Sequence, residues 1–412
     1  MEAERIDLAV VGAGAAGLMA AISAGRACRE AGRHASIALF DGARTLGAKI
    51  LVAGGGRCNV THDTVSAEDY AGSSRNAIRK VLLRFGVAET VAFFREIGVE
   101  LKREGTGKLF PVTDRARTVL DALLGAARAA GAEVRHPWRI EGVAGDAEGF
   151  LLSGGPRPVR ARRVVLATGG KSLPKSGSDG HGYEIARSLG HSITPRVFPA
   201  LVALLLDASS PLRALSGLTL PATLELRSPT GRRLVAFTDS TLCTHWGISG
   251  PSVLDISRYW LDAPEGSRLV ANWLPGETPE SVDRALCALG PRTVARYLGE
   301  RLPQRLAEAL CAVAGVDPRT PGHSLERERR RALAAGACAM HLPVAGDRGW
   351  NFAEATAGGV PLGEVRLETM ESRVRQGLHL CGEMCDVDGR IGGFNFQWAW
   401  ASGHVAGRSA IV

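Results

Sequence analysis

The first forty residues alternate between continuous apolar runs and an alanine-rich stretch with helical composition. Ile6–Val11 is an apolar run interrupted only by Asp7, Ala15–Ala31 is predicted to be a helix, and Ser36–Phe40 is a second apolar run that ends at Asp41. Continuous apolar runs of this length are typical of parallel strands that are covered on both faces. The pattern therefore predicts an opening β–α–β unit.

The hydrophobic period changes several times along the rest of the chain. Amphipathic spacing predicts helices at Arg75–Phe85, at Ala88–Ile97 and at Thr113–Ala130, the last with Thr113 or Asp114 as its cap. Strand-like segments around 133–160 lead to a buried run, Val164–Ala167, and short mixed strands follow at Leu201–Leu206, Ala222–Leu226 and Arg233–Thr238. Helical spacing with high charge density returns from 278 to 340, and β character resumes after Gly358-Gly359. We find no internal repeat.

This succession predicts an α/β protein in which one domain is interrupted by two others. We assign residues 1–192 and 352–412 to a discontinuous Rossmann-like domain built from both ends of the chain. Residues 193–262 and 341–351 are assigned to an inserted β-rich domain, and residues 263–340 to a helical domain. A chain of 412 residues is long enough for such a division.

Composition narrows the class of protein. With 45% apolar and 22% charged residues the chain is typical of a soluble globular protein, and no apolar run approaches the roughly 18 residues of a membrane span. The N-terminus enters a strand without a signal-peptide pattern, so we expect a cytoplasmic location and no membrane partner. A net charge of +8 permits a polyanionic partner without demonstrating one. Eight cysteines without CxxC spacing predict free thiols and no metal site.

Three glycine-bearing turns, far apart in sequence, each follow an apolar run. They are Gly12–Gly17, Ala167–Gly170 and Gly382-Glu383. In the first, Gly12 allows a tight turn, Gly14 lets a phosphate approach the backbone, and Gly17 allows close packing of helix on strand. The pyrophosphate of a dinucleotide would then lie at the N-terminus of the following helix. One such turn can hold a dinucleotide, but three indicate a longer ligand held by both ends of the chain, namely FAD.

Acidic residues support this assignment. Asp41 lies 24 residues after Gly17, where a carboxylate can bind both ribose hydroxyls of an adenosine. The run Val164–Gly170 resembles the second FAD signature of two-dinucleotide-binding flavoproteins. Gly377–Glu383 resembles their third signature, in which an acid binds the ribityl chain; here that acid is Glu383. A second GxGxxG is lacking, so we expect no dedicated nicotinamide domain.

A second glycine cluster follows in Gly54-Gly55-Gly56-Arg57-Cys58-Asn59. Three successive glycines let the backbone pass against a flat ligand, and Arg57 offers a planar cation to phosphate or flavin carbonyls. Only one cysteine is present in this stretch, so a flavin–disulfide relay is not expected. Cys58 is either a proton donor near the flavin or, as we favour, a small buried packing residue.

Two further segments have a functional and a structural interpretation. In Thr244–Pro251, His245 and Ser249 lie beside a Gly-Pro turn, where they either bind substrate at the flavin or form a domain-joining turn capped by Ser249. The basic residues near the two helices from 75 to 97, and after Lys108, form either a phosphate-binding rim or ordinary solvated helix faces, which we favour. They are Arg75, Arg79, Lys80, Arg84, Lys108, Arg115 and Arg117.

The chain resembles the BaiN/YhiN-like (RdsA-like) flavoprotein family in segments that span nearly its whole length, and the combination of GGGRCN with GGFNFQWAWASG is specific. The matching segments are Lys49–Asn59, Ala167–Leu173, Gly177–His191, Thr244–Ser257, Ala355–Val360 and Thr369–Gly407. The resemblance implies an FAD domain of the two-dinucleotide-binding flavoprotein type, with an inserted β-rich domain and a helical domain. It also implies an FAD-dependent oxidoreductase, whose branches include ribosomal RNA dihydrouridine synthesis, bile-acid-type enone reduction and aminoacetone oxidation.

These arguments give a set of expected site residues. Cys58 and His245 are the catalytic candidates. The residues expected to contact FAD are Gly12, Gly14, Ala15, Ala16, Gly17, Asp41, Gly42, Lys49, Gly54, Gly55, Gly56, Arg57, Cys58, Asn59, Thr168, Gly169, Gly170, Gly382, Glu383, Asp386, Gly392, Gly393, Phe394, Asn395 and Gln397.

The leading functional hypothesis is an FAD-dependent reductase with NAD(P)H as transient electron donor. Reduced flavin would pass hydride to an activated C=C, in a small molecule or in a uracil of ribosomal RNA, while a nearby acid protonates the neighbouring carbon. Two alternatives stay open. One is a flavin-dependent amine oxidase that uses O2, and the other is a non-catalytic, flavin-bearing RNA-binding factor.

Overall fold

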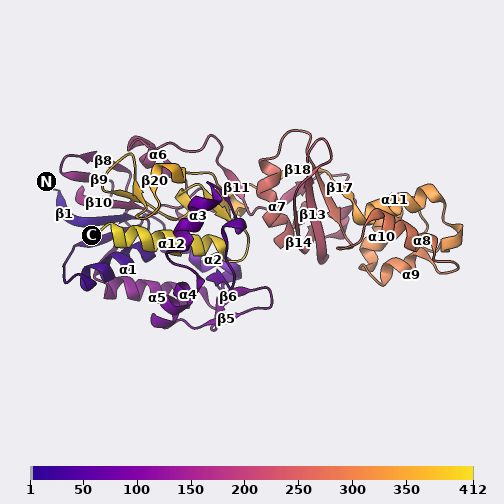
Figure 1. The fold of residues 1–412 in the computed structure, drawn as a ribbon, viewed down its shortest axis with the longest axis horizontal. Helices are drawn as coiled ribbons and strands as arrows, with labels where there is room; N and C mark the ends of the chain where they lie inside the picture. The colour runs from indigo at the N-terminus through magenta and orange to yellow at the C-terminus, as the bar shows by residue number, and fades with distance from the viewer. Residues whose placement is uncertain (1–2, 412) are drawn as a thin grey trace. The chain divides into compact units, whose positions relative to one another are not determined.

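A computed structural model describes residues 3–411, which form two compact units. The first unit contains residues 1–199 and 353–412, and the second contains residues 200–352. Each unit has its own apolar core. Figure 1 shows the first unit from indigo through magenta, closed by the yellow C-terminal segment. The expected Rossmann-like FAD-binding fold, built from both ends of the chain, is confirmed for the first unit.

In the part of the chain that is described, nine strands form the main sheet of the first unit. Its core is parallel, because β10 pairs in parallel with both β1 and β22, and β2 pairs in parallel with β1 and β7. In sheet order the strands are β20 (Val365–Arg366), β21 (Glu371–Ser372), β22 (Leu378–Leu380), β10 (Val159–Leu166), β1 (Glu4–Val11), β2 (Ile37–Phe40) and β7 (Ala132–Arg135). In addition, β9 (Gly149–Ser153) pairs with β10, and β8 (Gly142–Asp146) pairs with β9.

Seven helices belong to the same unit among the described residues. They are α1 (Ala15–Glu30), α2 (Ala48–Gly56), α3 (Arg75–Leu82), α4 (Val87–Glu96), α5 (Ala116–Ala129), α6 (His181–Ser188) and α12 (Phe394–Ser409). Short strands complete it: β3 (Thr61–His62), β4 (Tyr70–Gly72), β5 (Leu101–Arg103), β6 (Lys108–Pro111), β19 (Ala355–Ala357) and β23 (Val387–Gly389). The chain leads into the second unit through β11 (Phe198–Ala200).

Helix α12, formed by the C-terminal segment, packs along α1, as Figure 1 shows for the yellow and indigo helices. The contact depends on glycines in α12. A Cβ atom at Gly403 would lie 2.4 Å from the carbonyl oxygen of Ala16, and one at Gly407 would lie 2.0 Å from that of Ala20. Because neither distance leaves room for a methyl group, the close approach of the two helices requires glycine at both positions. This packing joins the end of the chain to its beginning.

The second unit combines a seven-stranded sheet with five helices, within its described residues. In sheet order the strands are β17 (Met340–Leu342), β16 (Arg268–Asn272), β13 (Thr219–Arg227), β14 (Arg233–Thr244), β15 (Gly247–Ser249), β12 (Leu204–Leu206) and β18 (Val344–Asp347). The helices are α7 (Pro251–Leu261), α8 (Pro279–Cys287), α9 (Val294–Gly299), α10 (Gln304–Val313) and α11 (Arg327–Cys338). Apolar residues of both kinds of element share one core cluster. The separate β-rich and helical domains stay a prediction.

The expected helix cap at Thr113 or Asp114 is wrong. Helix α5 begins at Ala116 after Arg115, two residues or more beyond Thr113 and Asp114, and no side chain caps it. Asp114 instead has a left-handed backbone and pairs with Lys102. Helix α7 begins at Pro251 after Gly250, without a side-chain cap, and Ser249 belongs to β15. Within residues 3–411, no helix is both long and apolar enough to cross a membrane.

We expect Gly407→Ala to destabilise the first unit by about 1–3 kcal/mol, because the new methyl group would press α12 away from Ala20. The thermal unfolding midpoint should fall by about 2–4 °C per kcal/mol. Gly125→Ala is the matched control, since Gly125 is exposed on helix α5 and its Cβ would meet nothing within 4 Å. That control should stabilise the helix by about 1 kcal/mol. Equal midpoints for the two variants would contradict this account of the α1–α12 contact.

Acid should destabilise the first unit through a histidine of α12. His404 stacks on Phe85 with ring centroids 4.5 Å apart, and burial together with the charges of Arg408 and Arg26 lowers its pKa to about 4. Since this folded-state pKa lies below the ordinary value of about 6.5, the unfolded chain binds more protons between the two values. The stability contributed by neutral His404 is therefore complete above about pH 6.5 and is lost as the pH falls toward 4.

We expect His404→Gln to reduce the loss of thermal stability between pH 7 and pH 5 relative to the unsubstituted protein. The measurement is the unfolding midpoint at both pH values. His34→Gln, at an exposed surface histidine, serves as the control and should follow the unsubstituted protein. If His404→Gln also follows it, protonation of His404 does not limit stability in acid.

Candidate active site

The strands that precede the glycine turns end together at one edge of the main sheet. Val11 pairs with Leu166 and with Phe40, and Leu166 pairs with Leu380. Because these strands are parallel and in register, their carboxyl ends lie side by side. The three turns and the acid after β2 are therefore neighbours, although they are up to about 370 residues apart in sequence. Ligands of open parallel sheets bind at such an edge.

The three glycines of the first turn differ in their surroundings. A Cβ at Gly12 would lie 2.4 Å from the carbonyl oxygen of Ala167, and one at Gly17 would lie 1.8 Å from that of Gly12. A Cβ at Gly14 would meet nothing within 4 Å. Gly12 and Gly17 are thus required by protein packing, whereas Gly14 borders open space at the N-terminus of α1, which no side chain caps. This is the environment that a phosphate group requires.

Asp41 is fixed at the end of β2 by backbone hydrogen bonds. Its Oδ2 accepts from the N–H of Ala13 at 2.8 Å, and its Oδ1 accepts from the N–H of Ala43 at 2.8 Å. Each carboxylate oxygen retains lone pairs for further donors. The half-buried carboxylate is thereby held beside the first turn, where the hydroxyls of an adenosine ribose could donate to it.

Glu383 and Lys49 form an ion pair at the third turn. Oε1 of Glu383 accepts a hydrogen bond of 2.6 Å from Ser172, and Lys49 donates to Ser172 at 2.7 Å and to Ser178 at 3.4 Å. Burial alone would raise the pKa of Glu383, but the charge and hydrogen bond of Lys49 and the hydroxyl donors lower it below its ordinary value. The carboxylate is therefore ionised at neutral pH, ready to accept from a polyol.

Three hydroxyl residues of this cluster were not predicted from the sequence. Ser172 and Ser178 follow the second turn, and Oγ1 of Thr356 in β19 accepts from the backbone N–H groups of Lys171 and Ser172 at 2.8 and 3.0 Å. Available signals were the polar composition of the loop after Gly170 and the position of Thr356 within the run Ala355–Val360. Neither signal specifies a hydrogen-bond partner 150 or more residues away.

The three consecutive glycines lie at the end of α2 with left-handed backbones and are exposed. Their φ angles are +57°, +69° and +86° for Gly54, Gly55 and Gly56. Side chains rarely adopt such angles, so glycine is required here, and it leaves bare backbone facing solvent. The neighbouring Arg57 stacks on the ring of Phe110 at 4.1 Å and donates to Glu104 at 2.6 Å. A flat ring can lie against an exposed backbone of this kind.

The two residues after Arg57 differ in what they offer. Asn59 is 8% exposed, and its Oδ1 atom is buried without a hydrogen-bond partner in the described residues. Buried polar atoms are normally paired, so this oxygen fits a ligand donor. Cys58 is completely buried in the apolar core, and burial raises the pKa of its thiol to about 12. These surroundings favour the packing interpretation of Cys58 over proton donation.

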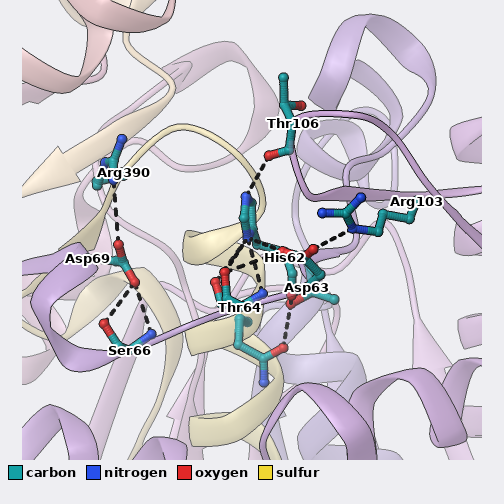
Figure 2. A network of polar contacts seen from close by, with 10 residues as sticks. His62, Asp63, Thr64, Ser66, Asp69, Arg103, Thr106 and Arg390 are labelled. Atoms are coloured by element: carbon teal, nitrogen blue, oxygen red, sulfur yellow. Dashed lines mark hydrogen bonds and ion pairs between the residues drawn. The ribbon is translucent and has the colours of Figure 1, made fainter. Parts of the chain in front are cut away.

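Several of the residues expected at the cofactor lie at the start of α12. Gly392 and Gly393 have left-handed backbones, and Phe394 stacks on His62 with ring centroids 5.0 Å apart. Figure 2 shows His62 between two carbonyl groups, 2.9 Å from that of Thr106 and 3.0 Å from that of Thr64. The imidazole thus links the loop after β3 to the loop between β5 and β6.

Gln397 does not reach a ligand. It is fully buried, its amide oxygen accepts from Thr61 at 2.7 Å and from Thr90 at 3.0 Å, and its amide nitrogen donates to the carbonyl of Phe85 at 2.9 Å. The polar atoms of the Gln397 side chain are therefore used inside the core, which leaves none of them for the cofactor. Asn395 similarly bonds both backbone groups of Gly389 at 2.9 Å.

Asp386, His245 and the basic residues of α3 have surroundings of their own. Asp386 accepts a hydrogen bond of 3.3 Å from Ser73. His245 is exposed in the second unit, between β14 and β15, where its carbonyl oxygen accepts from Arg213 at 2.9 Å. The basic residues of α3, namely Arg75, Arg79 and Lys80, are exposed, as solvated helix faces are.

Taken together, the strand-end cluster has the parts that FAD requires. It has an open helix N-terminus for the pyrophosphate at Gly14, an ordered carboxylate for the adenosine at Asp41, and an ionised carboxylate for a polyol chain at Glu383. The exposed glycine backbone and the unpartnered Asn59 oxygen suit the edge and face of a flat ring. The residues present therefore fit FAD.

Comparison with known proteins agrees with this geometry. Residues 6–409 match the family model described as HI0933-like protein Rossmann domain. A 3-dehydro-bile acid delta(4,6)-reductase of Clostridium scindens is 34% identical over 98% of both chains. A ribosomal RNA dihydrouridine synthase of Escherichia coli is 32% identical over 99% of both chains. The resemblance to the BaiN/YhiN-like flavoproteins is thereby confirmed.

Solved structures support the fold alone. A 3-ketosteroid-delta4-(5alpha)-dehydrogenase from Rhodococcus jostii is 16% identical with a TM-score of 0.50, and the match covers 100% of this chain and 98% of that one. A quinol-fumarate reductase is 17% identical with a TM-score of 0.51, over 100% of this chain and 71% of that one. From the family match, the full-length relatives and the fit of the strand-end cluster, we conclude that the chain belongs to the HI0933-like Rossmann-domain family and is an FAD-dependent oxidoreductase.

Proposed function

We propose that this protein is a reductase that saturates a carbon–carbon double bond conjugated to a carbonyl group. The observation that carries the proposal is the agreement of two relatives, each more than 30% identical over nearly the whole chain, whose names both describe such a product. A delta(4,6)-reductase saturates a C=C of a steroid ring, and dihydrouridine is uridine with its C5–C6 bond saturated. The acceptor is a small enone or a uracil in ribosomal RNA, and reduced NAD(P)H is the donor.

When bound, FAD supplies the two-electron carrier for such a reaction. The chain's part is to hold and orient it. Gly14 leaves space for the pyrophosphate, Asp41 would hold the adenosine ribose, and the carboxylate of Glu383, kept ionised by Lys49, would hold the ribityl hydroxyls. Of the two expected catalytic residues, His245 stays a proposal for substrate binding, whereas the buried thiol of Cys58 is a poor acid near neutral pH.

An RNA acceptor agrees with the charge of the chain. The net charge of +8 and the exposed cations of α3 would attract a phosphate backbone in a salt-dependent manner. A uracil would have to leave its stack to reach the flavin ring. A steroid-like enone instead requires an apolar surface. Experiment must separate these acceptors, and the expected cytoplasmic location likewise stays a prediction.

The role of Gly14 gives a direct test of cofactor binding. Its φ of −79° suits any residue and a Cβ there meets no protein atom, so Gly14→Val should leave the fold intact. The added side chain would fill the space proposed for the pyrophosphate. We expect the dissociation constant for FAD to rise at least about tenfold, which corresponds to about 1.4 kcal/mol of binding free energy, and the flavin absorbance per protein molecule to fall.

Two controls accompany this variant. The unfolding midpoint of the flavin-free protein should stay within about 2 °C of the unsubstituted chain, which excludes a packing defect. Gly363→Val, at another glycine with open space, should retain flavin. Full flavin content in Gly14→Val would show that the pyrophosphate does not lie at this turn.

The reaction class is tested by reducing the purified flavoprotein anaerobically and then adding one acceptor at a time. The acceptors are 4-androstene-3,17-dione, a uracil-containing ribosomal RNA transcript, and air. We expect one of the two C=C acceptors to reoxidise the flavin and to be recovered as the saturated product. NADH and NADPH are compared as donors in the preceding reduction.

The alternatives predict other results in the same experiment. Rapid reoxidation by air with both C=C acceptors inert, together with consumption of an amine, would favour the amine oxidase. Tight, salt-dependent binding of the transcript without any flavin turnover would favour the flavin-bearing RNA-binding factor.

A further inference from the structure

An exposed aromatic side chain of the second unit lies against a cation. Phe352 is 50% exposed. A single exposed apolar residue needs no explanation by itself. This one, however, is stacked, because the guanidinium carbon of Arg348 lies 3.6 Å from the centroid of its ring and 4.6 Å from that of Trp246. Trp246, Arg348 and Phe352 therefore form one aromatic–guanidinium group, which we call the stacking cluster.

Three neighbouring strands hold the stacking cluster in place. β12 lies between β15 and β18 in the sheet of the second unit. Trp246 directly precedes β15, and its carbonyl oxygen accepts from the N–H of Leu206 at 3.1 Å. Arg348 directly follows β18, and its N–H donates to the carbonyl oxygen of Ala203 at 3.1 Å. The backbones that carry the ring and the cation are thus fixed to both sides of β12, which lowers the entropy lost when a ligand binds.

Positive charge lies beside these rings. Within residues 3–411, no ion pair engages the guanidinium of Arg348. Arg213 lies beside the β14–β15 turn, where it donates to the carbonyl oxygen of His245 at 2.9 Å. The exposed His245 ring meets that of Trp246 edge-on, with centroids 6.3 Å apart. The surface therefore presents a flat apolar ring next to cations.

This combination suits a ligand that joins a flat ring to an anion. The guanidinium of Arg348 covers one face of the Phe352 ring, and the exposed half of that side chain is accessible to a second flat group. An unpaired nucleotide has both parts, since any base can stack on an aromatic ring and arginine binds phosphate. A steroid has no anion, and seating it here would remove water from an unpaired guanidinium. A duplex keeps its bases stacked inside.

We propose that the stacking cluster binds an unpaired nucleotide of an RNA strand, an inference that rests on the proposed function for its choice of partner. Phe352 stacks on the base, and Arg348 binds the adjacent phosphate while its guanidinium stays against the ring. His245, beside Trp246, then belongs to the surface that binds the substrate strand.

The test measures how tightly the oxidised flavoprotein binds a short, fluorescein-labelled oligouridylate, by fluorescence anisotropy. Phe352→Ala should raise the dissociation constant about tenfold, because stacking on one base is lost. Phe352→Tyr keeps the ring and should bind within about twofold of the unsubstituted protein. Val313→Ala, at another exposed apolar side chain of the second unit, is the control and should leave the constant unchanged. Flavin content and the unfolding midpoint check the fold of each variant.

The salt dependence separates the contribution of the ring from that of the cation. For a single strand, the slope of log K against log salt changes by about 0.7 for each phosphate contact. Arg348→Gln should therefore weaken binding and reduce the slope by about 0.7. Phe352→Ala should weaken binding without changing the slope. Arg296→Gln, at an exposed arginine paired with Glu300, removes the same charge elsewhere in the unit and should keep both the affinity and the slope.

The outcomes separate this inference from the proposed function. If Phe352→Ala and Arg348→Gln bind oligouridylate as tightly as the unsubstituted protein, the stacking cluster does not bind RNA, and the reductase assignment is unaffected. If the unsubstituted protein binds no oligouridylate but is reoxidised by 4-androstene-3,17-dione, the RNA-binding role fails and the reductase acts on a small enone. If binding depends on Phe352 and Arg348 but no C=C acceptor reoxidises the flavin, the RNA-binding surface stands and the reductase assignment is wrong.

Discussion

The parallel, in-register pairing of β1, β10 and β22 is the constraint on which the site depends. Backbone bonds continue it into the turns: Gly12 donates to Phe40 at 2.8 Å, Ala167 donates to Val11 at 2.8 Å, and Cys381 donates to Leu166 at 3.1 Å. A shift of one residue in any pair would move a turn by about 3.3 Å and reverse the faces of its side chains. The ladder therefore fixes where a phosphate, a ribose and a ribityl chain can be held at once.

The strand ends can meet in this way only because the backbones of neighbouring elements approach one another closely. The contacts of Gly12 with Ala167, and of Gly403 with Ala16, exclude even a methyl group. The same residue type at Gly14 and Gly55 meets no protein atom and leaves space for a ligand. Glycine thus has two opposite uses in one unit. Where it lies between elements it permits packing, and where it faces outward it exposes the backbone.

The electrostatic surroundings then give different properties to carboxylates that the sequence alone cannot distinguish. Asp41 is ordered by two backbone N–H groups, and Glu383 is ionised beside Lys49. The difference arises from donors supplied by distant segments, above all Ser172, rather than from neighbours in sequence. The tertiary structure thereby decides how an acid at a strand end is ordered and charged.

The sequence by itself determined the parallel Rossmann-like core, the strand ends and the FAD-type turns, because apolar runs and the Gly12–Gly17 spacing are local properties of the chain. It misplaced the start of α5, since Asp114 adopts a left-handed backbone and pairs with Lys102, a partner set by the β5–β6 hairpin. It could not show that Gln397 is consumed in the core, that Cys58 is buried, or that Ser172 and Thr356 surround Glu383. Those facts depend on contacts between segments that can be more than 300 residues apart in sequence. Only folding decides which polar atoms are paired and which stay available to a ligand.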